Sequence, residues 1–218
     1  MTLALFDLDH TLLQGDSDHT WGRFLVRKGL VDQETYAQTN NDFYQQYSNG
    51  TLDIHEYAAF ALHFISQTDR ATLEQLHREY MASEILPMIS QKARDLVEWH
   101  RSQGHTLVII TATNSFVTTP IAKELNIPNL LAIDIQMDGE RYTRKIAGVP
   151  TFREGKVTRL NMWLADRHET LAGSYFYSDS HNDLPLMLQV DHPIAVDPDP
   201  KLKAYAEQQG WQIISLKD

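Results

Sequence analysis

Residues 3–11 read Leu-Ala-Leu-Phe-Asp-Leu-Asp-His-Thr, an apolar run that ends in two carboxylates, Asp7 and Asp9. The four apolar residues 3–6 predict a buried strand. In extended backbone, residues two apart point to the same side, so both carboxylates are expected to face one site. Their mutual repulsion calls for a cation, and a divalent metal bound through oxygen meets that need. The stretch therefore predicts a metal-dependent site at the end of a first strand.

Polar residues that follow apolar runs, or that open a helix-like stretch, recur at four later positions: Thr111, Lys156, Asp179 and Asp183. Thr111 ends the apolar run 107–110, and Asp179 follows the run 175–177. In an open α/β sheet, ligands bind beyond the carboxyl ends of the strands. Three separate strands are thus expected to bring polar groups to one edge of a sheet.

In this order, the four motifs resemble those of the haloacid dehalogenase superfamily of phosphohydrolases: Asp-x-Asp-x-Thr, a strand-ending Thr, a helix Lys and Ser-Asp-x-x-x-Asp. Their spacing accounts for essentially the whole chain. The resemblance implies an α/β fold, with a Rossmann-like three-layer core, a parallel sheet and an inserted all-helical cap. It also implies a Mg2+-dependent phosphomonoester hydrolase that acts through an aspartyl-phosphate intermediate.

The resemblance assigns roles to the matching residues. The expected catalytic residues are Asp7, Asp9, Thr111 and Lys156. The expected metal-binding residues are Asp7, Asp9, Asp179 and Asp183. Asp7 would attack phosphorus, and Asp9 would move the proton and offer its backbone carbonyl to Mg2+, with Asp183 acting through water or by orienting a neighbour. Backbone N–H groups of Leu8, Asp9 and Ala112 would bind the phosphoryl oxygens beside Thr111, and Lys156 would neutralise their charge.

Composition is typical of a soluble enzyme. The 218 residues are 42% hydrophobic and 22% charged, enough for a substantial core and for one domain with or without an added module. A net charge of -10 argues against a nucleic-acid partner, and the absence of Cys excludes disulfides and a thiolate site. The apolar start is too short for a signal peptide or a membrane span, so we expect a cytoplasmic protein. The resemblance implies a small phosphorylated metabolite as its partner. The oligomeric state is not set by the sequence.

Periodicity divides the chain into an α/β core, 1–14 and 87–218, and a helical insert, 15–86. The insert resembles the C1-type cap that lies between the first two motifs in the phosphoserine phosphatase-like branch of the family. Within the cap, apolar residues between 54 and 65 repeat at helical spacing, and Asp53 resembles a helix N-cap. Further helices are expected before and after it, with breaks at Asn49-Gly50 and Thr68-Asp69.

After Pro87, helices and apolar strands alternate, which is the rhythm of a parallel sheet. We expect a helix over 89–103 and a hairpin or loop excursion within 142–152. The expected strands after the first are 107–110, 130–135, 175–177, 194–196 and 212–214.

The cap carries few groups that could bind a substrate anion. The phosphoserine phosphatases of this branch, subfamily IB, hold the substrate carboxylate with a cap arginine, yet residues 29–69 contain neither Lys nor Arg. Asp16 and Asp18 lie just after the first motif, and as expected substrate-binding residues they instead favour a cationic substrate. The stretches 7–21, 111–114 and 152–156 resemble the histidinol-phosphate phosphatases of this branch, so we expect histidinol phosphate as the substrate. Five basic residues flank the gap and keep phosphoserine open: Arg23, Arg27, Lys28, Arg70 and Arg78.

Other functions were weighed against this one. Another small-metabolite phosphatase or a phosphotransferase would show the same motifs. A non-catalytic binding protein would usually lack one of the first two acids, and a dehalogenase has no need of Asp9 or of the full acidic metal site. Taken singly, an Asp or Thr at a strand end is most often a cap or turn residue. His10 and His181 lie inside motifs that do not require histidine, and no His-Glu-x-x-His pattern indicates zinc.

Overall fold

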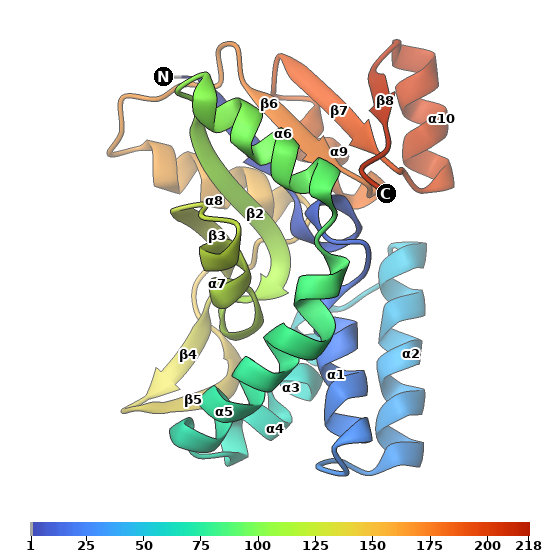
Figure 1. Cartoon of the computed structure of the whole chain (residues 1–218), viewed down its shortest axis with the longest axis vertical. Helices are drawn as coiled ribbons and strands as arrows, with labels where there is room; N and C mark the ends of the chain where they lie inside the picture. Colours follow the sequence, from blue (N-terminus) through green and yellow to red (C-terminus); the bar gives the residue numbers. More distant parts are fainter. Residues whose placement is uncertain (1) are drawn as a thin grey trace.

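The computed structural model describes residues 2–218 and is built around a six-stranded parallel sheet of order β3-β2-β1-β6-β7-β8 (Figure 1). Its strands are β1 (Leu3–Phe6), β2 (Thr106–Asn114), β3 (Asn129–Ile133), β6 (Tyr175–Ser178), β7 (His192–Val196) and β8 (Gln212–Ile214). Strand β1 pairs with β2 on one side and with β6 on the other. The three strands that lead into predicted motifs are therefore neighbours in the middle of the sheet.

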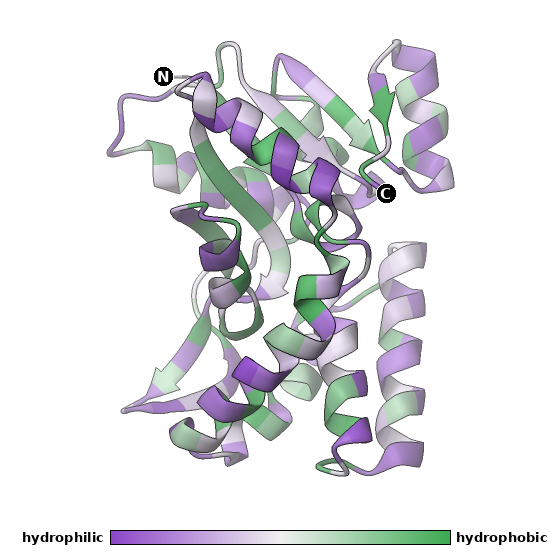
Figure 2. Cartoon of the chain, in the orientation of Figure 1, coloured by the Kyte–Doolittle hydropathy of each residue, from purple (hydrophilic) through white to green (hydrophobic). Residues whose placement is uncertain are grey.

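Helices cover both faces of the sheet. One face carries α6 (Gln91–Ser102) and α7 (Ser115–Glu124), and the other carries α8 (Glu154–Leu164), α9 (Leu184–Met187) and α10 (Pro200–Gln209). Successive residues of β1 point to opposite faces, so Phe6 packs in the first core cluster and Leu5 in the second. Figure 2 shows the resulting hydrophobic colour along β2. The predicted three-layer α/β fold is confirmed.

A helical segment joins β1 to α6 and stands beyond the carboxyl ends of the strands (Figure 1). It contains α1 (Ser17–Arg27), α2 (Gln33–Asn49), α3 (Ile54–Ala61), α4 (His63–Gln67), α5 (Arg70–Tyr80), and the short turns η2 (Met81–Ile85) and η3 (Leu86–Met88). Asp53 caps α3 as predicted, accepting from the backbone N–H groups of His55 and Glu56. The prediction of a single helix over 54–65 is wrong, because the chain forms two helices there, α3 and α4, separated at Leu62. The division into a core and a cap at residues 15–86 stays a prediction.

An antiparallel hairpin, β4 (Ile135–Asp138) and β5 (Arg141–Ile146), leaves the main sheet and packs against the helical segment. The expected strand 130–135 runs past the end of β3, and the expected excursion at 142–152 starts too late, because the hairpin already begins at Ile135. Strand β3 ends at Ile133, and Ile135 turns away to bury its side chain beside Ala58 and Leu62. The apolar pattern could not show this, since burial in the sheet and burial against a helix select the same residue types.

Within residues 2–218, none of the helices combines the length and the apolar character that crossing a membrane requires.

Candidate active site

A buried lysine joins two carboxylates at the carboxyl edge of the sheet. Lys156, in the first turn of α8, donates from Nζ to Oδ1 of Asp7 and to Oδ2 of Asp183, each over 2.7 Å. Asp7 directly follows β1, and Asp183 closes the turn η4 (His181–Asp183) after β6. The same Oδ2 of Asp183 also accepts from Ser178 Oγ at 2.7 Å. The structure thus brings the first, third and fourth motifs into direct contact.

Asp179 lies beside the turn that follows Asp7. The hydroxyl of Thr11 is 3.4 Å from Oδ1 of Asp179 and accepts from the Asp179 backbone N–H at 3.1 Å. This links the first motif to the fourth and fixes the Asp179 carboxylate next to that of Asp7. Both carboxylates line the same pocket.

Asp9 is held by backbone and side-chain donors from two other elements. It lies in the tight turn η1 (Leu8–Leu12), where His10 adopts the left-handed conformation with φ 57°. Its Oδ1 accepts from the Ser17 backbone N–H at 2.6 Å, at the start of α1, and its Oδ2 accepts from Thr113 Oγ1 at 2.7 Å. Sequence reasoning missed Thr113, although it is two residues from Thr111 and therefore on the same side of the strand.

Strand β2 continues three residues beyond the predicted end at Thr111. Thr111 and Ala112 line the pocket, whereas Leu8 is fully buried and does not line it. The Thr111 hydroxyl accepts from the backbone N–H of Thr113 at 3.1 Å, which fixes its direction. The expectation that the strand stops at Thr111 is wrong: its register with β3 shifts after Ile110, and pairing resumes at Asn114.

The carboxylates outnumber the basic group that they surround. Burial raises the pKa of Asp7 to about 7, although the Lys156 ammonium opposes the shift. Burial, followed by the nearby charges of Asp7 and Asp183, raises the pKa of Asp179 well above its ordinary value. Burial lowers the pKa of Lys156, but the Asp183 and Asp7 carboxylates outweigh it and hold that pKa above its usual range. One ammonium therefore leaves negative charge that a further cation would balance.

The carboxylate oxygens at this site are donors of the type that Mg2+ prefers. Among residues 2–218, no cluster of three or more His, Cys, Asp or Glu side chains is arranged to hold an ion. Mg2+ needs only one or two carboxylates, because water and substrate phosphate complete its shell. Asp7 and Asp179 supply such a pair.

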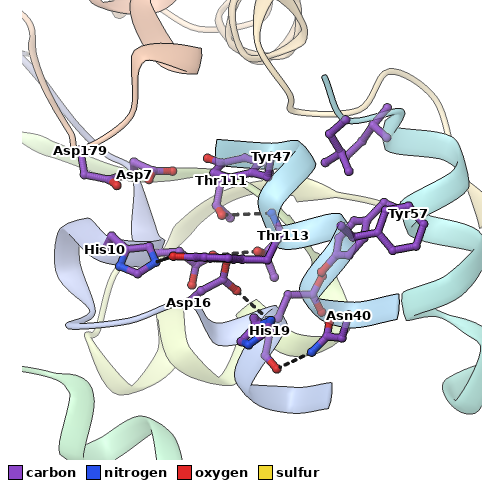
Figure 3. A pocket seen from close by; sticks show the side chains of 17 residues that line it. Asp7, His10, Asp16, His19, Asn40, Tyr47, Tyr57, Thr111, Thr113 and Asp179 are labelled. Atoms are coloured by element: carbon purple, nitrogen blue, oxygen red, sulfur yellow. Dashed lines mark hydrogen bonds between the residues drawn. The ribbon is translucent and has the colours of Figure 1, made fainter. Parts of the chain in front are cut away.

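The pocket beyond these carboxylates is acidic and partly aromatic (Figure 3). Five aspartates line it: Asp7, Asp9, Asp16, Asp18 and Asp179. No Lys or Arg is among its lining residues in the described part of the chain. The helical segment contributes seven further lining residues: Asn40, Phe43, Tyr44, Tyr47, Leu52, Ile54 and Tyr57.

Asp16 and Asp18 both reach this pocket from the start of α1. Asp16 caps the helix by accepting from the backbone N–H of His19 at 2.7 Å. Asp18 accepts from the Tyr57 hydroxyl at 2.9 Å and from Asn114 Nδ2 at 3.2 Å. Burial, followed by the charge of Asp16, raises the pKa of Asp18 to about 7. A cationic ligand beside Asp18 would stabilise the ionised form of its carboxylate.

His10, unassigned from the sequence, lines the pocket together with His19. The Tyr44 hydroxyl is 3.4 Å from His10 Nε2, and the Tyr44 ring centre is 5.1 Å from that of His19. These planar groups form one wall of the acidic pocket. No residue pattern in the sequence linked them, because they come from η1, α1 and α2.

Comparisons with known proteins agree with this geometry. Residues 4–188 match the family model of haloacid dehalogenase-like hydrolases. A protein of Neisseria meningitidis serogroup C (strain 8013), named histidinol-phosphatase, is 44% identical over 220 residues, covering 99% of each chain. A crystal structure of a protein of unknown function from Bordetella pertussis Tohama I has a TM-score of 0.93 and 43% identity, with all of both chains covered. A substrate-bound phosphoserine phosphatase has the same fold, with a TM-score of 0.72, 14% identity, and coverage of 99% and 93%.

Proposed function

The chain belongs to the haloacid dehalogenase-like hydrolases and is a phosphomonoester hydrolase, and we propose that histidinol phosphate is its substrate. The observation that carries the proposal is the pocket lined by five aspartates, without Lys or Arg among its described lining residues. Histidinol phosphate offers an amine and an imidazole and has no carboxylate. The 44% identical protein named histidinol-phosphatase supports the same substrate.

Phosphoserine fits this pocket less well, because its carboxylate requires a cationic partner. The five flanking basic residues that the sequence left open do not line the pocket. Arg27 forms an ion pair with Glu84, and Lys28 forms one with Glu79 at 2.6 Å. Such pairs hold these side chains on the outer surface of the helical segment. A substrate without a carboxylate is therefore favoured.

In the proposed mechanism, an oxygen of the Asp7 carboxylate attacks phosphorus and forms an aspartyl-phosphate, which water then hydrolyses. Asp9 protonates the leaving oxygen in the first step and accepts the proton of water in the second. Its two hydrogen bonds, from Ser17 and Thr113, hold the carboxylate in place for both steps. Burial raises the pKa of Asp9 to about 6, which suits a group that must both give and take a proton near neutral pH.

Other residues bind and neutralise the phosphoryl group. Lys156 lies 2.7 Å from Asp7, so its ammonium is placed to balance charge on the nucleophile and on the group being transferred. Thr111 and the backbone N–H of Ala112, both of which line the pocket, are proposed to donate to phosphoryl oxygens. Asp183, bonded to Lys156 and Ser178, orients the lysine.

We propose Mg2+ as the cofactor, held by the Asp7 and Asp179 carboxylates and the Asp9 backbone carbonyl, with Asp183 behind them. When bound, the ion supplies positive charge that polarises the phosphoryl group. The excess of buried carboxylates over the single ammonium of Lys156 supports this assignment.

The proposal is tested by changing Asp18, which lies in the substrate end of the pocket. Asp18→Asn keeps the size of the side chain but removes the charge that is expected to bind the substrate ammonium. The expected result is a rise in KM for histidinol phosphate of roughly tenfold or more, the effect of losing one charge-assisted hydrogen bond. KM for an aryl phosphate that has no amine should change little. Phosphate release with Mg2+ present measures both.

A matched control is Asp69→Asn, an aspartate that caps α5 away from the pocket. It should leave the ratio of the two KM values as in the wild type. Equal effects of Asp18→Asn on both substrates would exclude Asp18 as the amine-binding group.

A further inference from the structure

Helix α2 supplies much of the pocket wall, and its aromatic contacts with α3 come from Tyr36 and Phe43, in its first two-thirds. Of its 17 residues only Asn40 is buried, and that side chain donates to the backbone carbonyl of His19 at 3.1 Å. Its aromatic residues Tyr44 and Tyr47 face the pocket rather than a closed core. Apolar burial therefore contributes little to holding the carboxyl end of α2 in place.

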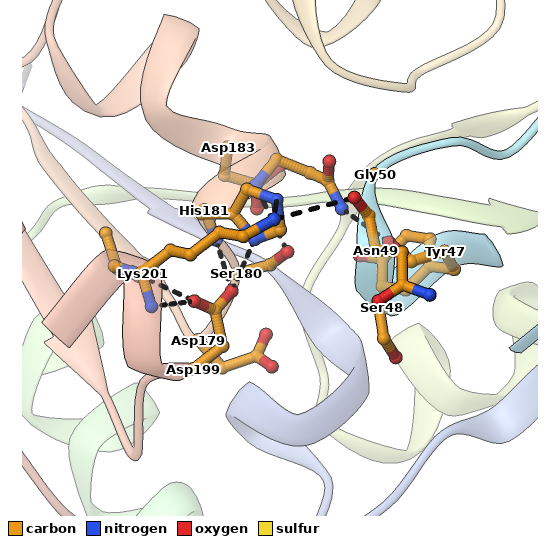
Figure 4. Close-up of polar contacts among 12 residues, drawn as sticks. Tyr47, Ser48, Asn49, Gly50, Asp179, Ser180, His181, Asp183, Asp199 and Lys201 are labelled. Carbon is orange, nitrogen blue, oxygen red and sulfur yellow. Dashed lines mark hydrogen bonds and ion pairs between the residues drawn. The ribbon is translucent and has the colours of Figure 1, made fainter. Parts of the chain in front are cut away.

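Polar side chains from the α/β core instead bind that end of the helix. Asn182 Nδ2 donates to the carbonyl of Tyr47 at 3.2 Å, and Arg153 Nη2 donates to the carbonyl of Gly50. Lys201 Nζ donates to the carbonyl of Asn49 at 3.5 Å. Figure 4 shows this end of α2 facing His181 and Lys201 across the gap between the segments. The last carbonyls of a helix lack intrahelical partners and carry partial negative charge, so donors and cations bind there.

Arg153 is held in an unusual conformation for this contact. It has φ 52° and ψ -123°, a region that side-chain-bearing residues rarely adopt, and it lies three residues before Lys156. Its Nε donates to Oδ1 of Asn182 at 3.2 Å, and its guanidinium lies over the Phe152 ring. One arginine thus connects the turn before α8, the turn after β6 and the end of α2. Strain of this kind persists where the surrounding contacts fix it, often at functional sites.

Gly50 completes the contact on the side of the helix. It ends α2 with φ 75°, and a Cβ there would lie 3.0 Å from Arg153 Nη2 and 3.3 Å from His181 Nε2. A side chain at this position would therefore push Arg153 away. The junction is built for close approach of the two segments.

The end of α2 also lies between two neighbouring cavities. The pocket encloses about 50 Å³, room for only a few waters. A second, wider cleft of about 480 Å³ lies next to it. The two cavities share four lining residues: His10, Tyr44, Tyr47 and Asp179. A metabolite phosphate that passes from the cleft into the pocket would therefore pass the two tyrosines of α2.

We propose that Arg153, Asn182 and Lys201 are positioning residues that form a latch on the carboxyl end of α2. The latch holds Tyr47 against the phosphoryl end of the pocket, and its release admits substrate and frees product. The inference rests on the proposed function only in taking this pocket as the phosphatase site. Burial, followed by the charges of Asp7, Asp183 and Asp179, raises the pKa of Tyr47 well above its ordinary value, in keeping with a phenol beside the reacting groups.

The first test needs no substrate. Arg153→Met keeps an unbranched stem similar to that of arginine and removes the donors. Hydrogen–deuterium exchange then reports the opening of the peptide covering residues 46–51. Exchange should become about five- to tenfold faster, the effect of losing one or two hydrogen bonds. The matched control is Arg144→Met, since Arg144 makes a similar bond, from Nε to the Ala59 carbonyl at 2.8 Å, away from the pocket. Unchanged exchange in Arg153→Met, with its melting temperature near that of the wild type, would overturn the latch.

The second test separates positioning from stability through a double-mutant cycle. Arg153→Met and Tyr47→Ala should each lower kcat/KM for histidinol phosphate, and in the Arg153→Met background Tyr47→Ala should cost at least about threefold less than in the wild type. Fully additive losses would show that Arg153 does not act through Tyr47. Faster exchange in Arg153→Met without phosphate release by the wild type would support the latch and reject the proposed function.

Discussion

Lys156 is the residue on which the geometry of the centre depends. Its ammonium binds Asp7 and Asp183 at the same distance, 2.7 Å, and all three side chains are buried. A buried charge pair is costly unless each partner is satisfied, and here Ser178 adds a further donor to Asp183. The arrangement holds the Asp7 carboxylate in one orientation beside the pocket, as a nucleophile requires.

Asp7→Asn tests that role at the level of one atom. The amide keeps the size of the side chain and an oxygen for Lys156, but it is a far poorer nucleophile. Phosphate release should therefore fall by at least about a thousandfold, while the circular dichroism spectrum stays that of the wild type. Activity near the wild-type level in a folded variant would rule out the aspartyl-phosphate.

The sequence predicted which motif residues would gather at the site but not the side chains that hold them. Asp7, Lys156 and Asp183 could be found because each lies in a short motif at a strand or helix end. Spacing could have placed Thr113 beside Thr111, but its hydrogen bond to Asp9 and that of Tyr57 to Asp18 could not be predicted, since they join residues 104 and 39 positions apart. Such pairing depends on the tertiary fold and leaves no local pattern.

At the scale of elements, the start of α8 sets the position of Lys156. Gly155 approaches the preceding turn so closely that an added Cβ would lie 1.9 Å from the carbonyl oxygen of Pro150. That oxygen belongs to the backbone, so a larger residue must move the helix rather than a flexible side chain. The glycine of the Glu-Gly-Lys stretch is thus required by packing.

Gly155→Ala should shift α8 and with it the ammonium of Lys156. We expect the free energy of unfolding to fall by about 1–3 kcal/mol and kcat to fall as well, because overpacking a tight site displaces backbone. Urea unfolding and phosphate release measure the two effects. Gly15→Ala is the control, since its added Cβ would meet only the flexible Met88 side chain, 3.3 Å away. A Gly155→Ala protein as stable and active as that control would refute the packing argument.

Elements with strong local signals were predicted, and those set by tertiary contacts were not. Aspartates cap α1, α2, α3 and α5, and the Asn49-Gly50 and Thr68-Asp69 breaks fall where α2 and α4 end. The break at Leu62 and the departure of Ile135 from the sheet both bury apolar side chains between the hairpin and α3. Both depend on a partner element that is distant in the sequence.

At the scale of the whole molecule, two buried histidines link stability to pH. Burial lowers the pKa of His77 to about 4, and burial followed by His105 lowers the pKa of His100 to about 4, against an ordinary value of 6.5. Between these values the unfolded chain binds protons that the folded chain does not. Each histidine therefore reduces the free energy of unfolding as pH falls from about 6.5 to about 4.

His77→Phe isolates one of these contributions. His77 packs among Trp21, Tyr80 and Phe116, and its buried Nε2 has no hydrogen-bond partner in the described structure. The variant should gain stability relative to the wild type as pH falls through this window, by up to roughly 3 kcal/mol. Urea unfolding at pH 7 and pH 4.5 gives the difference, and His55→Gln, at an exposed site, should show none. A constant difference between the two pH values would exclude His77 as a source of the pH dependence.

At this scale we propose that an acidic pocket between the sheet and the helical segment selects an aminated phosphomonoester without a carboxylate. The most direct measurement is kcat/KM of the wild type for histidinol phosphate and for phosphoserine, by phosphate release with Mg2+ present. We expect a preference for histidinol phosphate of about a hundredfold, or roughly 2.7 kcal/mol of transition-state discrimination. Equal values, or a preference for phosphoserine, would contradict it.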